Sequence, residues 1–132
     1  MRSGSRTARM VGGRANVDLV AETGGKVSIS GPGAVEGMAV TVTIKAYDAE
    51  PPFRARARGI QYPSYYDVKI EGIPDGSASV CLTSTSGKDP TVMRYLKNNA
   101  WLDAGNLKPS GRTITGEIRV SDLFGSPIII GT

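Results

Sequence analysis

The sequence predicts an all-β protein, an antiparallel β-sandwich, and three observations support this fold class. Short segments of alternating apolar and polar residues recur along the chain, and a period of two is typical of a strand with one buried face. Turn signals separate these segments at intervals of about ten residues, the spacing of a sandwich or barrel. The composition agrees, since 17 glycines and 8 prolines supply turns and the periodic segments are rich in Val, Ile and Thr.

The length of the chain indicates a single domain. A chain of 132 residues can bury a core without disulfides or a metal. We expect this core within residues 16–132. Residues 1–15 are rich in Ser, Gly and Arg and have no hydrophobic period, so the sequence predicts a disordered basic leader, linker or tag there.

The first half of the domain is predicted to contain a hairpin and one long strand. Residues 16–21 and 26–30 alternate on either side of a Thr-Gly-Gly turn and form the hairpin. Residues 38–47 form the clearest strand, with one buried and one wet face. Its apolar positions are Val40, Val42, Ile44 and Ala46, and its polar positions are Thr41, Thr43, Lys45 and Tyr47. Two prolines end this strand, and residues 53–64 are predicted to cross between sheets.

The second half continues the same pattern. Strands are predicted at residues 65–70, 77–84 and 92–96. The last of these turns back at Asn98-Asn99 into a hairpin that contains Trp101, because asparagine tolerates the left-handed backbone that tight hairpins require. Residues 112–120 form a further strand, with Ile114, Gly116, Ile118 and Val120 on its apolar face.

The chain is predicted to end in core structure. Residues 121–125 form a single helical turn capped by Ser121. Residues 127–130 then form a strand without a polar member, which suits burial on both sides, so Ile128 to Ile130 should be buried. In total we expect eight or nine strands in an immunoglobulin-like sandwich. Its terminal strands, at residues 16–21 or 127–130, are expected to add to the sheet of a neighbouring subunit.

The net charge of +4 is concentrated near the start of the sequence. Arg2, Arg6, Arg9 and Arg14 account for it, since the remaining chain has 12 basic and 12 acidic residues. A nucleic-acid surface is therefore not expected on the folded body. The sequence contains no stretch of eighteen apolar residues, so no membrane-spanning helix is predicted. The chain shows no signal peptide, so an extracellular or cell-surface location is expected only if an upstream precursor carries the signal.

The residue types present argue against catalysis. Histidine is absent, which removes the commonest general base and metal ligand. Cys81 lies mid-strand, where a small packed residue is expected rather than a nucleophile. The carboxylates that could act in pairs on glycosides lie mostly at turns, so solvation at the surface accounts for them. They are Asp67, Glu71, Asp75, Asp103, Glu117 and Asp122. We expect no enzymatic activity, no cofactor and no metal site, and leave weak calcium binding at Asp48 and Glu50, or at Asp75 and Asp89, open.

Two groups of side chains are candidates for ligand binding. Arg54, Arg56 and Arg58 alternate, so on a strand they project from one face and can hold phosphates or acidic sugars. A solvated edge strand gives the same pattern without a ligand. The second candidate is an aromatic platform for sugars or single-stranded nucleic acid, with core packing as the alternative. Its members are Trp101, Tyr47, Tyr62, Tyr65 and Tyr66.

Several short segments together carry a resemblance to known domains. They are Tyr-Tyr-Asp-Val at 65–68, Ser-Val-Cys-Leu at 79–82, Arg-Tyr through Trp at 94–101, Thr-Ile-Thr-Gly-Glu-Ile at 113–118 and Ser-Pro-Ile-Ile-Ile-Gly at 126–131. Over about residues 16–132 the chain resembles β-sandwich modules near the C-termini of large secreted and cell-surface proteins of archaea and bacteria. Gly111-Arg112 stands where those modules usually have Gly-Asn. The resemblance implies a role in spacing, anchoring or assembly, and no catalytic residue carries over.

These observations lead to one principal functional hypothesis and two alternatives. The first is a non-catalytic structural or adhesive module of a larger extracellular or cell-surface assembly, whose partners are neighbouring domains or subunits. The second is a carbohydrate-binding module of a secreted hydrolase, with a polysaccharide partner bound at Trp101 and the tyrosines between Tyr62 and Tyr66. The third is a virion or nucleic-acid-associated structural protein whose arginine leader binds phosphate.

Overall fold

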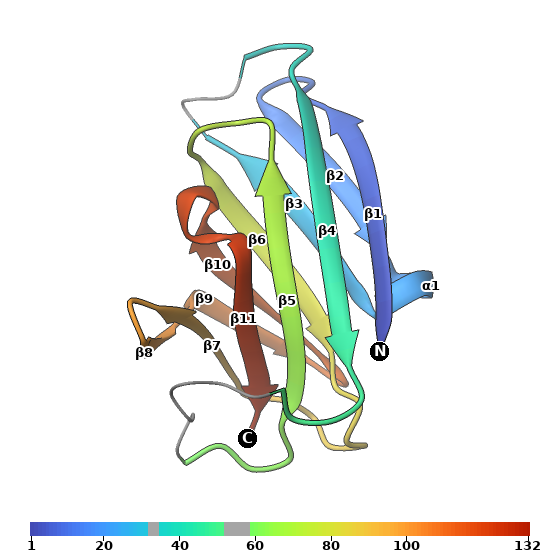
Figure 1. Cartoon of the computed structure of the whole chain (residues 1–132), viewed down its shortest axis with the longest axis vertical. Coiled ribbons are helices and arrows are strands. Elements are labelled where there is room, and N and C mark those ends of the chain that lie inside the picture. The colour runs from blue at the N-terminus through green and yellow to red at the C-terminus, as the bar shows by residue number, and fades with distance from the viewer. Residues whose placement is uncertain (32–34, 52–58) are drawn as a thin grey trace.

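The structure of the protein is a computed structural model, and it describes residues 1–31, 35–51 and 59–132. The strands are β1 (Arg2–Arg9), β2 (Arg14–Leu19), β3 (Gly25–Ser30), β4 (Ala39–Tyr47), β5 (Ser64–Glu71), β6 (Ser77–Thr83), β7 (Val92–Lys97), β8 (Ala100–Asp103), β9 (Gly105–Ser110), β10 (Thr113–Arg119) and β11 (Phe124–Gly131), with two helical turns, α1 (Val20–Thr23) and η1 (Val120–Asp122). A six-stranded sheet has the order β1-β4-β5-β11-β7-β8, and a five-stranded sheet has the order β2-β3-β6-β10-β9. The paired strands are antiparallel, so the fold is an all-β sandwich, with the six-stranded sheet nearer the viewer in Figure 1.

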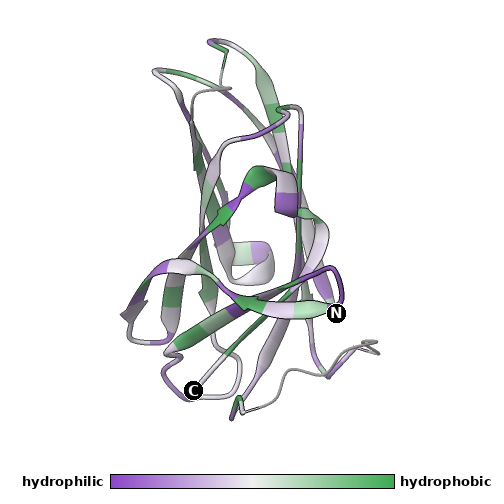
Figure 2. Cartoon of the chain, turned by 90° about the vertical axis from the view of Figure 1, so that its left-hand side faces the viewer, coloured by the Kyte–Doolittle hydropathy of each residue, from purple (hydrophilic) through white to green (hydrophobic). Residues whose placement is uncertain are grey.

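The core lies between the two sheets and follows the predicted alternation. Val40, Val42 and Ile44 of β4 have no exposed surface, whereas the residues between them are half-buried. The same alternation buries Val17 and Leu19 in β2, Val27 and Ile29 in β3, Ala78, Val80 and Leu82 in β6, and Ile114 and Ile118 in β10. Figure 2 looks at the sandwich from its edge, where hydrophobic and hydrophilic positions alternate along the strands.

Most predicted strands are confirmed. The β2–β3 hairpin, β4, β5, β6 and β10 lie within a residue or two of the expected ranges. Asn98 and Asn99 have φ angles of 51° and 64° and connect β7 to β8, as the asparagine turn predicts. The last strand is also confirmed as core, since Ile128 and Ile130 have no exposed surface and Ile129 is 3% exposed.

Two strands were missed by the sequence analysis, and one of them overturns the prediction of a disordered leader. Strand β1, within residues 1–15, pairs with β4 through eight consecutive residues. Strand β9 pairs with β10 around a bulge. None of the side chains of β1 or β9 is buried. Hydrophobic periodicity therefore cannot detect either strand, because each packs a single half-buried apolar side chain against the core, Ala8 or Leu107, and is held otherwise by main-chain hydrogen bonds.

The two helical turns also differ from the sequence prediction. Residues 20–23 form α1, so the strand expected over 16–21 ends at Leu19. Near the other end, η1 begins at Val120, and Ser121 makes no capping hydrogen bond. The buried hydroxyl of Ser126 instead donates to the main-chain oxygen of Asp122, so the closing polar contact comes from the residues after the turn.

The strand order corrects the prediction of which strands lie at sheet edges. Strand β2 is an edge strand as expected, but β11 lies between β5 and β7. Residues 127–130 therefore have no free edge for a neighbouring subunit, because both sides of the strand already carry ladder hydrogen bonds. Since β1 belongs to the sandwich, Arg2, Arg6 and Arg9 are part of the folded body, and the basic charge is not confined to a leader.

The buried face of β4 gives a direct test of the core. Replacing Val42, which has no exposed surface, by Ala is expected to lower the free energy of unfolding by about 2 kcal/mol, because two buried methyl groups are lost and a cavity remains. The matched variant Val11→Ala alters a side chain that is 69% exposed and should change stability by less than about 0.5 kcal/mol. Urea denaturation measures both values, and equal effects would contradict the assignment of β4 to the core.

Candidate functional site

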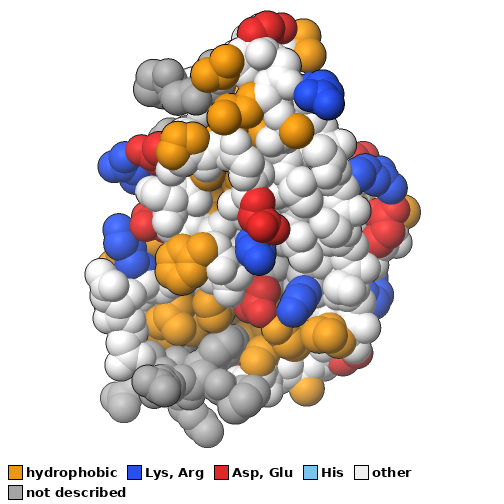
Figure 3. All heavy atoms as spheres, turned by 45° about the horizontal axis from the view of Figure 1, so that its top comes forward, with side chains coloured by type: hydrophobic (Ala, Val, Ile, Leu, Met, Phe, Trp, Pro, Cys, Tyr) orange, Lys and Arg blue, Asp and Glu red, His pale blue; other side chains and the backbone are white. Residues whose placement is uncertain are grey.

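The strand order of the six-stranded sheet gathers aromatic and apolar side chains on its outer face. Tyr47 of β4 is the cross-strand partner of Tyr65 of β5. Leu96 of β7 is the partner of Trp101 of β8. Between these pairs runs β11, where Pro127 faces outward. We call these five half-buried side chains the aromatic face, and Figure 3 shows hydrophobic groups gathered on this side of the molecule.

The outward direction of these side chains follows from their buried neighbours. Tyr66 and Ile128 are cross-strand partners and both point into the core, so Tyr65 and Pro127, one position away, point outward. Ile129 also belongs to the outer side and is only 3% exposed. The aromatic face therefore has an apolar floor as well as exposed rings.

Charged groups lie among the side chains of the aromatic face, since Asp67 is the cross-strand partner of Pro127 and Arg94 that of Ile129. The hydroxyl of Tyr47 donates to Oδ2 of Asp67 over 2.5 Å. Toward the β8 edge of the sheet, Nε of Arg94 donates to Oδ1 of Asp103 over 3.0 Å. Aromatic residues and arginine are enriched at surfaces that bind another molecule.

The hydrogen bond between Tyr47 and Asp67 changes the acidity of the tyrosine. This bond, together with partial burial and the negative charge of Asp67, raises the pKa of Tyr47 from 10.0 to about 12. All three causes act in the same direction, because each disfavours the phenolate. Tyr47 therefore stays neutral, and its donated hydrogen bond persists, at every physiological pH.

The structure separates the residues that the sequence analysis had grouped as an aromatic platform. Tyr65, Tyr47 and Trp101 share the aromatic face, but Tyr66 does not belong with them. Its ring is 1% exposed and its hydroxyl donates to the main-chain oxygen of Thr83 over 2.5 Å. Burial of the ring raises the pKa of Tyr66. The assignment of Tyr66 to a binding platform is therefore wrong, because the period of two places it on the opposite face from Tyr65.

Tyr62 lies outside the strands that form the aromatic face. Tyr62 is 51% exposed in the segment before β5, and Nζ of Lys88 lies 5.3 Å from the centre of its ring. Arg54, Arg56 and Arg58 are outside the described residues. Sequence analysis did not select Leu96 or Pro127, because an isolated apolar residue on a wet face becomes informative only when its neighbours across the sheet are known.

The outer face of the five-stranded sheet has a different character. A hollow of about 410 Å³ lies over β2, β3, β6 and β10. Its polar lining consists of Asn16, Asp18, Lys26, Ser28, Ser79, Cys81 and Thr115. The middle strand, β6, contributes the short side chains of Ser79 and Cys81, which explains the depression. Cys81 is half-buried on this outer face and is not packed in the core.

Most of the carboxylates considered for catalysis are used in ion pairs. Asp75 accepts a hydrogen bond from Nη2 of Arg119 over 2.6 Å, which lowers the pKa of this carboxyl group. Asp122 is an exception to the predicted surface solvation, because it is 7% exposed and pairs with Nζ of Lys97 at 3.0 Å. Each of these contacts joins neighbouring segments of the fold.

Residues 1–31, 35–51 and 59–132 contain no group of three or more His, Cys, Asp or Glu side chains placed to hold a metal ion. No helix in the same ranges is long and apolar enough to cross a membrane. Comparison of the chain with protein-family models, with curated proteins and with solved structures found no match. The fold and the surface thus define the class, an antiparallel β-sandwich with one aromatic outer face.

The acidity of Tyr47 is testable by alkaline titration. Tyrosinate absorbance should show late components from Tyr47 and Tyr66, because the pKa of both tyrosines is raised. The component near pH 12 should disappear in Tyr47→Phe and move toward pH 10 in Asp67→Asn. Tyr62→Phe removes a phenol elsewhere and should leave the late component in place. Because the folded-state pKa is raised, the contribution of Tyr47 to stability is complete below pH 10 and is lost as the pH rises through about 12. Loss of stability over this range should therefore be smaller in Tyr47→Phe, and an unchanged titration curve would contradict the hydrogen bond.

Proposed function

We propose that the protein is a non-catalytic structural or adhesive module of a larger extracellular or cell-surface assembly, and that it works through the aromatic face. An immunoglobulin-like arrangement is part of this proposal. It is supported by the two antiparallel sheets and by connections such as that from β5 to β6, which pass from one sheet to the other. The resemblance to β-sandwich modules of secreted proteins supports the location.

The contrast between the two outer faces carries this proposal. One face presents Tyr47, Tyr65, Leu96, Trp101 and Pro127, whereas the hollow on the other face is lined by polar and charged side chains and has no aromatic member. Tyrosine and tryptophan are enriched among the residues that dominate binding energy at interfaces, because each buries a large rigid ring and keeps a polar group at its edge. A sheet that needed only to be soluble would carry polar residues on both outer faces.

The size of the aromatic face fits a protein partner. The five side chains extend over β4, β5, β11, β7 and β8. The width of the face across these strands is four strand spacings, or about 19 Å. A stable interface uses about 800 Å² on each partner. The aromatic face can supply the centre of such an interface, with Asp67, Arg94 and Asp103 between its apolar side chains.

Self-association of the purified chain tests this proposal. We expect sedimentation velocity to show concentration-dependent association that Trp101→Ala weakens about 30-fold, as removal of an aromatic anchor worth about 2 kcal/mol requires. Tyr62→Ala is the matched control, because it removes an exposed aromatic ring outside the face. A wild-type protein that stays monomeric at millimolar concentration, or equal association in both variants, would contradict the proposal.

Carbohydrate binding is a second candidate that one observation favours. Tyr65 and Trp101 lie on the same face, with Arg94 and Asp103 paired between and beside them. Sugars stack their apolar ring faces on aromatic side chains and direct hydroxyl groups at charged hydrogen-bond partners. A surface that holds rings and ion pairs side by side offers both kinds of contact.

Polysaccharide binding separates the second candidate from the first. In a pull-down on insoluble polysaccharides, a carbohydrate-binding module should be retained, and Trp101→Ala should abolish retention while circular dichroism shows an intact fold. Tyr62→Ala should behave as wild type in the same assay. Retention that is absent in the wild type, or equal in the wild type and Trp101→Ala, removes this candidate.

A further inference from the structure

We propose that β1 is an exchangeable strand, and that the site it occupies on β4 accepts the β1 strand of a second copy of this chain. This contact is separate from the aromatic face and does not depend on it. The partner is identified by the site itself, because β1 is the segment whose side chains and register match that site. Reciprocal exchange of this strand between two copies gives a closed dimer.

The first argument is that β1 makes few core contacts. All eight of its residues are exposed or half-buried, whereas alternate residues of its neighbour β4 are buried. Ala8 is the β1 side chain that packs against the core, so removing β1 withdraws one small apolar side chain from it. Segments with few buried apolar contacts open at the lowest free energies, so β1 is expected to open before the rest of the sandwich does.

The second argument is that opening leaves an edge that favours strand addition. Without β1, the main-chain groups of β4 lose the partners that β1 supplies over Arg2 to Arg9. A long strand edge with unpaired main-chain groups is a template for another strand. A second copy of β1 restores every contact that the first one made, so exchange within a concentrated sample has little intrinsic free-energy cost.

The third argument is that the site specifies both sequence and register. Gly4 faces α1 so closely that a Cβ atom there would lie 3.2 Å from side-chain atoms of Leu19 and Glu22. Ser5 and Thr7 form a hydroxyl ladder with β4, because Ser5 Oγ lies 3.0 Å from Thr43 Oγ1 and Thr7 Oγ1 lies 2.7 Å from Thr41 Oγ1. A bulky fourth residue would clash with α1. A strand shifted by two positions would bring Arg2 or Arg6 to the place of Gly4, so the close contact of Gly4 selects the register.

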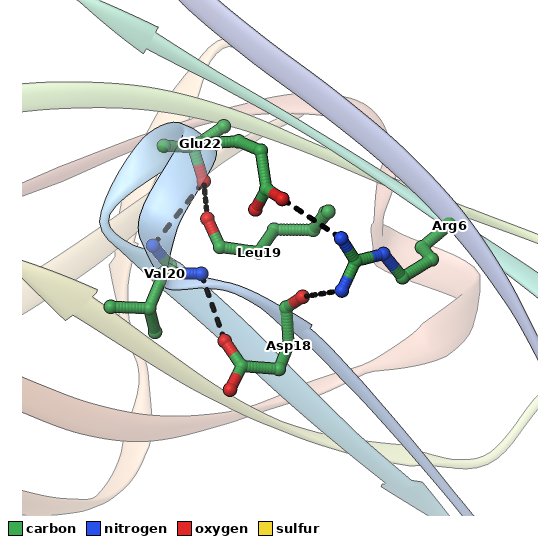
Figure 4. Close-up of polar contacts among 7 residues, drawn as sticks. Arg6, Asp18, Leu19, Val20 and Glu22 are labelled. Carbon is green, nitrogen blue, oxygen red and sulfur yellow. Dashed lines mark hydrogen bonds and ion pairs between the residues drawn. The ribbon is translucent and has the colours of Figure 1, made fainter.

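Arg6 connects β1 to β2 and α1 at the edge of the sandwich. Its Nη1 donates to the main-chain oxygen of Asp18 and its Nη2 donates to Oε1 of Glu22, both over 2.8 Å. Figure 4 shows the guanidinium between β2 and the α1 turn, with the Asp18 carboxylate directed instead to the main-chain nitrogen of Val20. This contact joins the two sheets at one edge. Because exposed groups make it, it contributes little to stability and does not prevent the strand from leaving.

Met10 marks the boundary between the exchangeable strand and the fixed domain. Its side chain has no exposed surface. Its main-chain nitrogen donates a hydrogen bond to the oxygen of Met38, and its main-chain oxygen accepts one from the nitrogen of Gly37. The adjacent Val11 and Arg14 also exchange two main-chain hydrogen bonds. Movement therefore needs rotation only at residues 9 and 10, and an eight-residue strand reaches about 27 Å from there, enough to meet a neighbouring β4.

Disulfide trapping between two differently tagged chains tests the exchange. One chain carries Ser5→Cys and the other Thr43→Cys, both with Cys81→Ser, because positions 5 and 43 are cross-strand partners. The two are mixed at high concentration, incubated in mild urea, returned to buffer and oxidised. We expect a disulfide-linked heterodimer at least tenfold above the yield of a shifted pair, Ser3→Cys with Thr43→Cys, whose Cα atoms lie too far apart in this register.

Further variants make the result specific to strand exchange. Arg6→Ala should accelerate heterodimer formation several-fold, because the strand loses its contact to β2 and α1. Trp101→Ala in both chains should leave the yield unchanged, which separates failure of this proposal from failure of association through the aromatic face. A single chain with Ser5→Cys and Thr43→Cys should close internally and then cease to exchange. Equal yields from the matched and shifted pairs, or a chain that does not close internally, would overturn the proposal.

Discussion

The packing of two apolar sheet faces against each other is the constraint on which the rest of this structure depends. Val42, Val80 and Ile128 come from different parts of the chain and have no exposed surface. Because side chains alternate along a strand, burying one set commits every intervening residue to an outer face. The core thus decides the composition of both outer surfaces, and the functional candidates are the residues that the core excludes.

The same constraint explains why the edges of the sandwich differ from its centre. Interior strands such as β5 and β11 are held by side-chain burial and by ladders on both sides. Strands β1 and β9 lie at the edges and bury no side chain. Main-chain hydrogen bonds stabilise them, supplemented at β1 by Arg6 and by the hydroxyl ladder to β4. Edge strands of this kind are the natural places for movement and for contact with other chains.

The two outer faces of the sandwich differ in composition. The aromatic face combines rings with the ion pair of Arg94 and Asp103, a composition suited to binding. The face over β3 and β6 is lined by short polar side chains around Cys81. A module with one aromatic face and one exchangeable edge strand can make two different contacts at once, which fits the proposed role in a larger assembly.

The sequence by itself determined the fold class, most strand positions and the buried residues of each strand. The burial of Ile128 to Ile130 follows from a β-branched run without a polar member. The other buried residues follow from a local rule, the period of two, which separates Tyr65 from Tyr66. The same rule could have excluded Tyr66 from the binding platform, had it been applied to the aromatic group. Local patterning also placed the Asn98-Asn99 turn, because left-handed backbone is a property of the residues themselves.

Only the tertiary structure decided the order of the strands, and with it the surfaces. Tyr47, Trp101 and Pro127 are distant in sequence and share a face because β4, β11 and β8 belong to one sheet in a particular order. The ordering of β1 was likewise beyond local analysis, since the residues that hold it lie on β4 and α1 rather than within it. The alternation within a strand determines which of its residues are buried, whereas packing of the whole chain determines which strands become neighbours.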